Sequence, residues 1–494
     1  MAWICLVLGE KTLAENLELA HSHEGYFDLV ELRADRLNPD QWDHIQDFPI
    51  SLSVPCILTL RQPQDGGSFV GSPGLRIAFF TKALEGSFKY WDLEEGQELP
   101  GLEVEFLRRG GRIIRSFHDF EGVPEDLSAR LKALSAGGSI PKAAVYPKST
   151  AQHLQIWRIL ESLELKEKIF LAMGPYGMPT RILAQRAGSL WTYASPKGQT
   201  LAPGQLNPMD LEDIYRFRNL KKSTPIYAIV GKPIHHTKSP SIHNPAFKGV
   251  GVSGVYVPFL VDDLEEFFPL AELLDIQGLS VTIPHKQAAC RFLGDSAPQS
   301  VATIGACNTL YKKEGRWCGE NTDAPGFMVP VLKKFGSSLK GLKVAVLGTG
   351  GAARGVLYGL LSQGAVPCLL GRDRTKTESL AKEFGVVFGA LNSSSKELLK
   401  EYSTLIAQTT SVGMGDQEGQ NPIDWYPLKG TETVYDIIYN PRKTALIESA
   451  LAAGCEVIYG ASMLMEQAFL QFFHFTGKPY PEALKGRVLR ILTV

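Results

Sequence analysis

The 494-residue sequence has few cysteines, no excess of either charge and no long hydrophobic run. None of its seven scattered cysteines forms a C-x-x-C pair, so neither a disulfide framework nor a zinc site is expected. Lysine and arginine total 51 against 52 aspartates and glutamates, which argues against a nucleic-acid partner. No stretch of about 18 apolar residues occurs, so no membrane span is expected. These absences predict a cytoplasmic globular protein without a metal.

The remaining composition is that of an ordinary globular protein. Apolar residues make up 44% and charged residues 21% of the chain, which excludes wholesale disorder. At roughly 150 residues per domain the length predicts about three structural units. The apolar start, Met1–Leu8, is followed at once by Gly9-Glu10-Lys11, so we expect a buried strand there rather than a secretory signal.

Residues 1–220 alternate short apolar segments with helix-length spacers. Alternating β and α elements imply a parallel sheet with right-handed crossovers. Eight such units in roughly 220 residues favour a (β/α)8 TIM barrel over an open sheet. The expected strands are Trp3–Leu8, Leu29–Leu32, Ile57–Leu60, Trp91–Leu93, Ile113–Ser116, Lys142–Val145, Ile169–Met173 and Leu190–Tyr193.

Polar side chains occur at or near the ends of these strands. They are Glu31, Arg33, Arg61, Glu94, His118, Asp119 and Lys142. In a barrel the carboxyl ends of the strands converge on one face, where barrel enzymes hold their catalytic residues. Charged residues without such a role would lie on outer helix faces, so this distribution predicts an active site.

Lys142 lies in a segment of apolar, β-forming residues, 139–146. Burial there would lower the pKa of the amine. A neutral amine can attack a ketone to give an iminium, which assists removal of an adjacent proton. The alternative is a lysine that extends to solvent at a strand end. His118 favours the catalytic interpretation, because this chemistry needs a group that transfers protons near neutral pH.

A series of short motifs runs through the first 210 residues. The motifs are Glu31-Leu-Arg33-Ala-Asp35, Thr59-Leu-Arg61, Ser116-Phe-His118-Asp119, Pro141-Lys142, Met173-Gly174, Arg181 and Ala202-Pro-Gly-Gln205. In order and spacing they resemble the type I 3-dehydroquinate dehydratases. The resemblance implies that Lys142 is the Schiff-base lysine and His118 the general acid and base. It implies that the substrate is bound by Glu31, Arg33, Arg61, Asp65, Arg181 and Gln205, with the fork of Arg181 suited to a carboxylate.

Two positions depart from the pattern of that family. Asp65 precedes Gly66-Gly67 where many members have glutamate, so the side chain expected beside His118 is one methylene shorter. Leu201 stands where serine often precedes Ala-Pro-Gly-Gln, so one hydrogen bond to substrate is expected to be absent. Neither change involves Lys142, so activity is still expected.

A second αβ pattern begins after residues 219–225, where the apolar pattern lapses. Within it the predicted strand Val344–Leu347 leads into Gly348-Thr-Gly350-Gly351 and a helix predicted over 352–363. Glycines between a strand and a helix let the backbone approach a pyrophosphate, as in a Rossmann fold. The residues expected to contact a dinucleotide there are Gly348, Gly350, Gly351 and Ala352.

The next predicted strand, Val366–Leu370, ends in Gly371-Arg-Asp-Arg-Thr-Lys376. NAD-specific folds usually have an acidic residue about 20 residues past the glycines, where this chain has Gly371 and Arg372. Arg372, with Arg374 or Lys376, can hold a 2′-phosphate, so NADP is the expected cofactor. Asp373 argues for NAD unless it is a solvated turn residue.

Several polar motifs lie between residue 226 and the C-terminus. They are Thr237-Lys-Ser239-Pro, Ser280-Val-Thr282-Ile-Pro-His-Lys286, Gly305-Ala-Cys-Asn308-Thr, Asn321-Thr-Asp323, Asp436-Ile-Ile-Tyr439-Asn-Pro and Met463-Leu-Met-Glu-Gln467-Ala. They resemble the shikimate dehydrogenases. The resemblance implies a catalytic pair, Lys286 and Asp323, that stabilises and protonates the alkoxide left by hydride transfer. It assigns substrate contacts to Thr237, Ser239, Thr282, Asn308, Tyr439 and Gln467.

Departures occur in this half as well. Thr237 replaces the first serine of the usual pair, Gln408 stands where asparagine is common, and Ser462 replaces a glycine before Met463.

The remaining histidines show no metal-ligand spacing; His235 and His236 adjoin the substrate loop. The others are expected at the surface or as helix caps: His21, His23, His44, His153, His243 and His474.

Together the two resemblances imply a bifunctional enzyme, a lyase followed by an NADP-dependent oxidoreductase, that acts on small molecules of the shikimate pathway. The expected domains are a barrel (1–220), a substrate-binding subdomain (225–335, completed by about 460–494) and a Rossmann subdomain (336–459). Two alternatives remain: the second half acts on quinate as well as shikimate, or one half is a non-catalytic metabolite-binding module.

Overall fold

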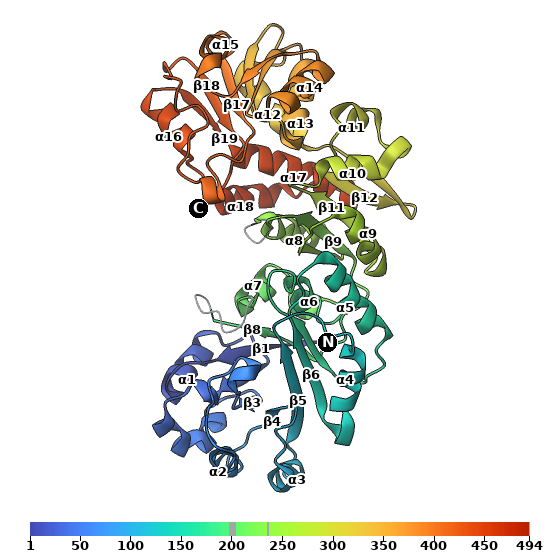
Figure 1. Cartoon of the computed structure of the whole chain (residues 1–494), viewed down its shortest axis with the longest axis vertical. Helices are drawn as coiled ribbons and strands as arrows, with labels where there is room; N and C mark the ends of the chain where they lie inside the picture. Colours follow the sequence, from blue (N-terminus) through green and yellow to red (C-terminus); the bar gives the residue numbers. More distant parts are fainter. Residues whose placement is uncertain (197–203, 235–236, 494) are drawn as a thin grey trace. The chain divides into compact units, whose positions relative to one another are not determined.

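The computed structural model describes residues 1–196, 204–234 and 237–493 (Figure 1). The chain divides into two compact units, Met1–Pro225 with Val257–Asp275, and Ile226–Tyr256 with Ile276–Val494. Leu201, His235 and His236 lie outside the described residues. Within the described ranges, every helix is too short or too polar to cross a membrane.

The first unit contains an eight-stranded sheet with the order β7-β6-β5-β4-β3-β2-β1-β8. Strands β1 to β7 therefore each pair with their neighbours in sequence, and β8 pairs with β1. The strands are β1 (Trp3–Leu8), β2 (Leu29–Arg33), β3 (Cys56–Thr59), β4 (Tyr90–Glu94), β5 (Arg112–Asp119), β6 (Ile140–Val145), β7 (Ile169–Ala172) and β8 (Trp191–Ala194). Each overlaps a predicted strand, and the predicted TIM barrel is confirmed.

The barrel closes between β7 and β8 through single hydrogen bonds rather than a regular ladder. Leu190 N donates to Lys168 O at 2.8 Å, and Phe170 N donates to Ser189 Oγ at 3.1 Å. These bonds join the amino-terminal ends of the two strands.

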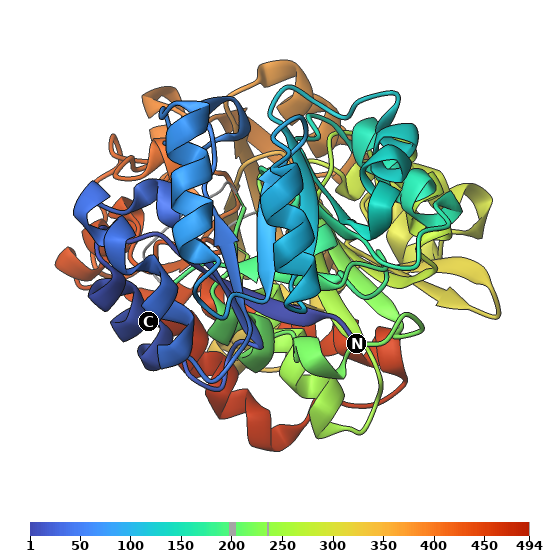
Figure 2. The same cartoon turned by 90° about the horizontal axis from the view of Figure 1, so that it is seen from below.

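Helices connect the strands of the barrel, and Figure 2 shows the blue and cyan helices in front of the strands. They are α1 (Leu13–Ser22), α2 (Pro73–Ala83), α3 (Pro100–Arg108), α4 (Leu127–Leu134), α5 (Thr150–Ser162), α6 (Met178–Ile182) and α7 (Pro208–Asp213). Local sequence sets their starts: Thr12 and Glu15 form a capping box on α1, and Ser149 caps α5.

Inside the barrel, a layer of apolar side chains is followed by polar side chains toward the carboxyl ends of the strands. An apolar cluster there contains Tyr90 of β4, Ile114 of β5 and Ile140 of β6. Side chains two residues apart on a strand share a face. Asp92 therefore follows Tyr90 into the interior, whereas Trp91 faces outward and stacks on Phe106 at 4.0 Å. The polar residues thus gather toward the carboxyl ends of the strands.

The second unit begins with a mixed sheet in which β9 and β11 run parallel and β11, β12 and β13 pair antiparallel. These strands are β9 (Ile226–Gly231), β11 (Ile276–Val281), β12 (Thr309–Lys313) and β13 (Arg316–Glu320). The associated helices are α8 (Ser239–Gly249), α10 (Lys286–Leu293), α11 (Gln299–Ile304), α12 (Asp323–Phe335), α17 (Gly460–Thr476) and α18 (Glu482–Thr493). Strand β10 (Val255–Leu260) contains the boundary between the units, and α9 (Leu264–Leu273) follows it.

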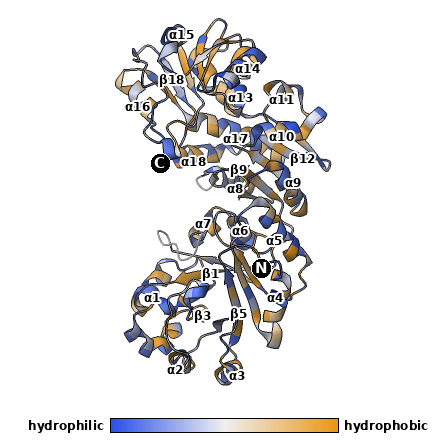
Figure 3. Cartoon of the chain, viewed as in Figure 1, coloured by the Kyte–Doolittle hydropathy of each residue, from blue (hydrophilic) through white to orange (hydrophobic). Residues whose placement is uncertain are grey.

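A six-stranded parallel sheet with the order β16-β15-β14-β17-β18-β19 completes this unit. Val344 and Val346 of β14 pack into one apolar core and Ala345 and Leu347 into another, so both faces are covered. Figure 3 shows the outer helices α14 and α15 largely hydrophilic. The elements are β14 (Lys343–Leu347), α13 (Gly351–Ser362), β15 (Val366–Gly371), α14 (Arg374–Phe384), β16 (Val387–Ala390), α15 (Lys396–Glu401), β17 (Leu405–Gln408), β18 (Thr433–Asp436), α16 (Ala445–Ala452) and β19 (Glu456–Tyr459).

Two histidines expected at the surface or as helix caps, His153 and His243, are buried within their helices, and that prediction is wrong for both; His23, which is also buried, is the C-cap residue of α1. His153 accepts a hydrogen bond from Trp157 Nε1 at 3.0 Å, and His243 stacks on Tyr256 with ring centroids 4.4 Å apart. Burial lowers the pKa of both rings to about 3. The neutral imidazole is the form that fits an apolar core.

Two candidate active sites

Lys142 lies inside the barrel, 2% exposed, with its Nζ surrounded by counter-charges. It donates to Asp92 Oδ2 at 2.6 Å and to Glu31 Oε1 at 3.4 Å. The ring of Tyr193 lies 4.3 Å from the nitrogen. On β6, Lys142 lies between Ile140 and Ala144, two members of the interior cluster, and strand alternation therefore directs it inward. The lysine does not extend to solvent.

Asp92 is the centre of this charge network. Arg61 donates to its Oδ2 at 2.8 Å and Ser116 to its Oδ1 at 2.5 Å. Burial alone would raise the pKa of Asp92, but the cations of Arg61 and Lys142 hold it well below its ordinary value. Glu31 accepts a hydrogen bond from Thr59 at 2.8 Å. The site therefore keeps an ionised aspartate beside the lysine.

His118 lies between Arg61 and Asp65. Arg61 Nη1 lies 3.0 Å from Nε2 and Asp65 Oδ1 lies 3.2 Å from Nδ1. Because arginine only donates, Nε2 accepts and the proton is assigned to Nδ1, facing Asp65. Burial and the cations Arg61 and Lys142 lower the pKa of His118 well below its ordinary value. His118 is therefore a neutral base near pH 7.

Asp65, although shorter than glutamate, reaches His118. Its Oδ1 also accepts the backbone N–H of His118 at 3.2 Å. Burial and the nearby charge of Glu94 raise the pKa of Asp65 to about 6. The departure from the family pattern therefore keeps the contact with the imidazole.

Three other predicted substrate ligands lie at the end of β2 or after β7 and β8: Arg33, Arg181 and Gln205. Arg33 binds Asp35 in a bidentate pair at 2.9 Å and donates to Gly66 O at 3.2 Å. Arg181 belongs to α6, which follows β7, and burial lowers its pKa to about 10. Gln205 follows β8, just after the segment 197–203 that lies outside the described residues.

Asp92 was not predicted from the sequence, whereas Glu94, two residues further on, was placed among the polar residues at the strand ends. Glu94 lies in the same strand but pairs with Arg76 of α2 at 2.5 Å. The signal for Asp92 was the alternation Tyr90-Trp91-Asp92-Leu93-Glu94, which places both carboxylates on one face.

In the second unit, Lys286 and Asp323 form an ion pair at 2.5 Å between Nζ and Oδ2. Each is the first residue of a helix, α10 and α12. Asp323 is 4% exposed, and its other oxygen accepts from Asn308 Nδ2 at 2.9 Å. A carboxylate at a helix N-terminus is stabilised by the helix dipole. The pair is therefore held in one orientation, with Lys286 as the partly exposed member.

The remaining predicted ligands in this unit lie on loops and on helices α8 and α17. Thr237 Oγ1 accepts the backbone N–H of Ser239 at 3.2 Å. Thr282 follows β11, and Tyr439 follows β18, where burial raises its pKa. Gln467 of α17 is 9% exposed. The structure also joins Gln471 to this group: it donates to Asn308 O at 3.1 Å and accepts from Ser280 at 2.8 Å. Sequence reasoning missed Gln471, and its position one helical turn after Gln467 was the only signal.

The glycine-rich turn lies beside this ion pair. Gly348 has a φ of +111°, and a Cβ there would lie 2.9 Å from Thr409 Oγ1. A Cβ on Gly351 would lie 3.1 Å from Lys286 Cβ, whereas one on Gly350 would meet nothing within 4 Å. The turn thus combines a tight backbone with open space at the N-terminus of α13, as a bound pyrophosphate requires.

The end of β15 has no room for an acidic side chain. A Cβ on Gly371 would lie 2.2 Å from Thr377 Oγ1 and 2.8 Å from Thr349 Cγ2. Asp373 caps α14 by accepting the backbone N–H of Lys376 at 3.1 Å. The neighbouring Arg372, Arg374 and Lys376 are exposed. Asp373 thus has a structural role that explains its presence.

Gln408 replaces an asparagine and organises the loop after β17. Its amide donates to Thr410 Oγ1 at 2.8 Å and to Val412 O at 3.0 Å, and accepts from Thr410 N at 3.0 Å. The longer side chain therefore fixes the backbone of 409–412. No described hydrogen bond involves the side chain of Ser462 in α17.

Comparisons with known proteins agree with both halves. Residues 4–222 match the model of type I 3-dehydroquinase, and residues 229–310 match that of the shikimate dehydrogenase substrate binding domain. The bifunctional 3-dehydroquinate dehydratase/shikimate dehydrogenase, chloroplastic, of Arabidopsis thaliana is 32% identical over 96% of this chain and 81% of its own. The shikimate dehydrogenase (NADP(+)) of Carboxydothermus hydrogenoformans is 37% identical over 52% of this chain and 94% of its own.

One solved structure is similar to the second half of the chain. The shikimate dehydrogenase of Aquifex aeolicus matches with a TM-score of 0.50 and 30% identity, over 55% of this chain and 99% of that one. Both resemblances drawn from the sequence motifs are thereby confirmed. The chain belongs to the family of bifunctional 3-dehydroquinate dehydratase/shikimate dehydrogenases.

Proposed function

We propose that the barrel dehydrates 3-dehydroquinate to 3-dehydroshikimate through an iminium at Lys142, and that the second unit reduces this product to shikimate with NADPH. The observation that carries the proposal is a buried amine held by Asp92 and Glu31 in one network with a neutral histidine. Such an arrangement supports Schiff-base chemistry with general base catalysis.

The first reaction needs the amine of Lys142, once it has given up a proton, to attack the substrate ketone. Water leaves as the iminium forms, and the cationic nitrogen then accepts electron density when an adjacent C–H proton is removed. Once the hydrogen bond from Arg61 is broken, Nε2 of His118 takes that proton and returns it to the departing hydroxyl. Hydrolysis of the iminium releases the enone and restores Lys142.

The second reaction leaves negative charge on the substrate oxygen. NADPH, when bound, would supply the hydride. Lys286 stabilises the developing alkoxide and protonates it, while Asp323 holds Lys286 in position. Gly348, Gly350, Gly351 and Ala352 would hold the pyrophosphate, and Arg372, Arg374 and Lys376 the 2′-phosphate. The crowding at Gly371 supports NADP over NAD, because no acidic side chain fits there.

We also propose a domain organisation and a cellular compartment for the chain. We assign residues 1–220 to the dehydratase, 225–335 with about 460–494 to substrate binding by the dehydrogenase, and 336–459 to NADP. All seven cysteines are free, which supports a reducing, cytoplasmic environment.

The direct test is to give the purified chain 3-dehydroquinate with and without NADPH. Ultraviolet absorbance of the enone should build up without NADPH and disappear when it is added. Absence of the enone signal would contradict the first activity. A parallel measurement of kcat/KM for shikimate and quinate tests the substrate of the second unit, and a preference for quinate would contradict the assignment.

The dehydratase rate should depend on the ionisation of Asp65. Below about pH 6 this carboxyl group is protonated. It then no longer stabilises the imidazolium that forms on His118. We expect kcat/KM for dehydration to fall as the pH drops below about 6, and Asp65→Asn to remove this limb and lower the plateau by at least about tenfold. A pH profile unchanged in Asp65→Asn would contradict the role of Asp65.

Arg372 should determine the choice of cofactor. Arg372→Ala removes the proposed partner of the 2′-phosphate, so we expect KM for NADPH to rise about ten- to a hundredfold, with little change for NADH. Lys382→Ala is a matched control, because Lys382 is an exposed cation at the other end of α14. Equal changes for both cofactors would place the 2′-phosphate elsewhere.

A further inference from the structure

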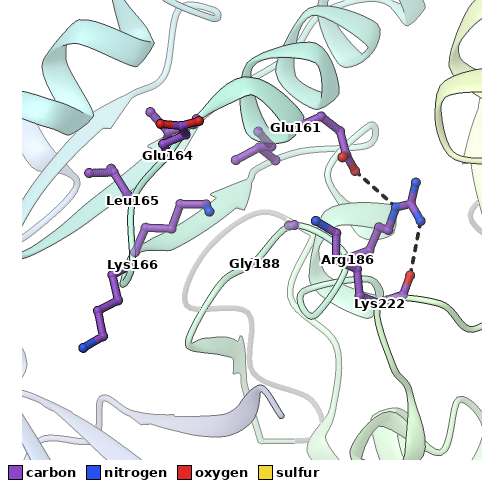
Figure 4. Close-up of a pocket in the computed structure, with 11 residues that line it drawn as sticks. Glu161, Glu164, Leu165, Lys166, Arg186, Gly188 and Lys222 are labelled. Atoms are coloured by element: carbon purple, nitrogen blue, oxygen red, sulfur yellow. Dashed lines mark hydrogen bonds and ion pairs between the residues drawn. The ribbon is translucent and has the colours of Figure 1, made fainter.

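A pocket of about 470 Å³ lies at the amino-terminal end of the barrel (Figure 4). Its walls come from the segments that lead into β7 and β8 and from the chain after α7. The residues of the Lys142 site lie toward the carboxyl ends of the strands, so the two sites lie at opposite ends of the barrel. Four cations and two carboxylates line the pocket: Lys166, Lys168, Arg186, Lys222, Glu161 and Glu164.

Lys168 is the unusual member of this group. It is 6% exposed, yet its ammonium makes no hydrogen bond or ion pair with any residue in the described ranges. Arg186, by contrast, pairs with Glu161 at 3.2 Å and donates to Lys222 O at 3.2 Å, the two dashed lines of Figure 4. The pocket therefore holds a surplus of positive charge.

The fold holds the ammonium of Lys168 in this pocket. The backbone of Lys168 closes the barrel by accepting from Leu190 N. A Cβ on Gly188 would lie 2.8 Å from Lys168 Nζ, so the glycine makes space for the ammonium. Burial and the charge of Lys222 lower the pKa of Lys168. Burial of a cation without a partner opposes folding, and an anion in the pocket would offset that cost.

We propose that this pocket binds a small organic oxyanion, with Lys168 as its principal contact. Lys166 and Lys222 add positive charge at the rim, where both are exposed. Leu160, Leu163 and Ala187 are buried lining residues that offer an apolar wall. The volume accepts a molecule larger than a bare ion, so a carboxylate or phosphate on a compact organic body fits the pocket.

Calorimetric titration of the full chain with citrate and with inorganic phosphate, at constant ionic strength set with chloride, tests the proposal. Lys168→Met removes the ammonium and keeps the stem, and we expect it to weaken binding at least about tenfold. Lys132→Met, at an exposed position on α4, should bind as the unaltered chain does. A response to citrate identifies a carboxylate site and a response to phosphate a phosphate site.

Equal binding by the unaltered chain and Lys168→Met, or no binding of either anion, would overturn the proposal. Both enzyme activities of Lys168→Met should stay unchanged without added anion, which shows that the variant is folded. Lys222→Met provides a second test at an exposed position, with the same direction of effect expected.

Discussion

Lys142→Met is expected to lower kcat for dehydration of 3-dehydroquinate by about four orders of magnitude or more. Methionine keeps the length of the four-atom stem but has no amine to form an iminium. His118 would keep its partners Arg61 and Asp65, yet without the electron sink the adjacent proton is too weakly acidic to remove. The measurement is a single-turnover assay of enone formation.

Lys142→Arg is the matched control for charge. It keeps a cation opposite Asp92 and Glu31, which Lys142→Met does not. Both variants should lack dehydratase activity and reduce 3-dehydroshikimate at the normal rate. Borohydride with substrate should trap a covalent adduct on the unaltered chain and on neither variant. Dehydration by either variant at a rate close to that of the unaltered chain would exclude the Schiff-base mechanism.

Lys286→Met is expected to lower kcat for reduction by about three orders of magnitude or more. The ammonium is the proposed source of the proton for the alkoxide, and no other cation pairs with Asp323 among the described residues. The affinity for NADPH, followed by fluorescence titration, should change little, and dehydration should be unaffected.

Asp323→Asn separates positioning from proton transfer. The amide keeps the size of the side chain and loses the charge that holds Lys286. We expect kcat to fall by about a hundredfold, less than in Lys286→Met. If Lys286→Met raised KM alone and left kcat unchanged, Lys286 would bind substrate without participating in the reaction.

Much of the fold was predictable because its signals are local. Each barrel strand is a short apolar segment followed by a helix-length spacer, and the predicted strands overlap those of the structure. The strand Val344–Leu347, the glycine motif and the helix after it occur as predicted, because a turn of this kind needs glycine at particular backbone positions. The motif order also identified the family, which the comparisons confirm.

Other features depended on contacts between distant segments. Asp92 from β4 contacts Lys142 from β6, 50 residues apart, and strand alternation does not distinguish it from Glu94, which lies on the same face of β4. Gln471 reaches Asn308 across 163 residues. His153 and His243 are buried because aromatic partners surround them, and nothing in the neighbouring sequence indicated this.

The sequence by itself determined the βα order, the positions of the glycine turn and the chemical types of the proposed catalytic side chains. These follow from periodicity and residue chemistry, which act over a few neighbouring residues. Only the tertiary structure decided the charge state and hydrogen-bond partners of those groups. The imidazole of His118 is neutral at neutral pH because burial and two cations, Arg61 after β3 and Lys142 within β6, act on it together. Such fields depend on distances that exist only once the chain has folded.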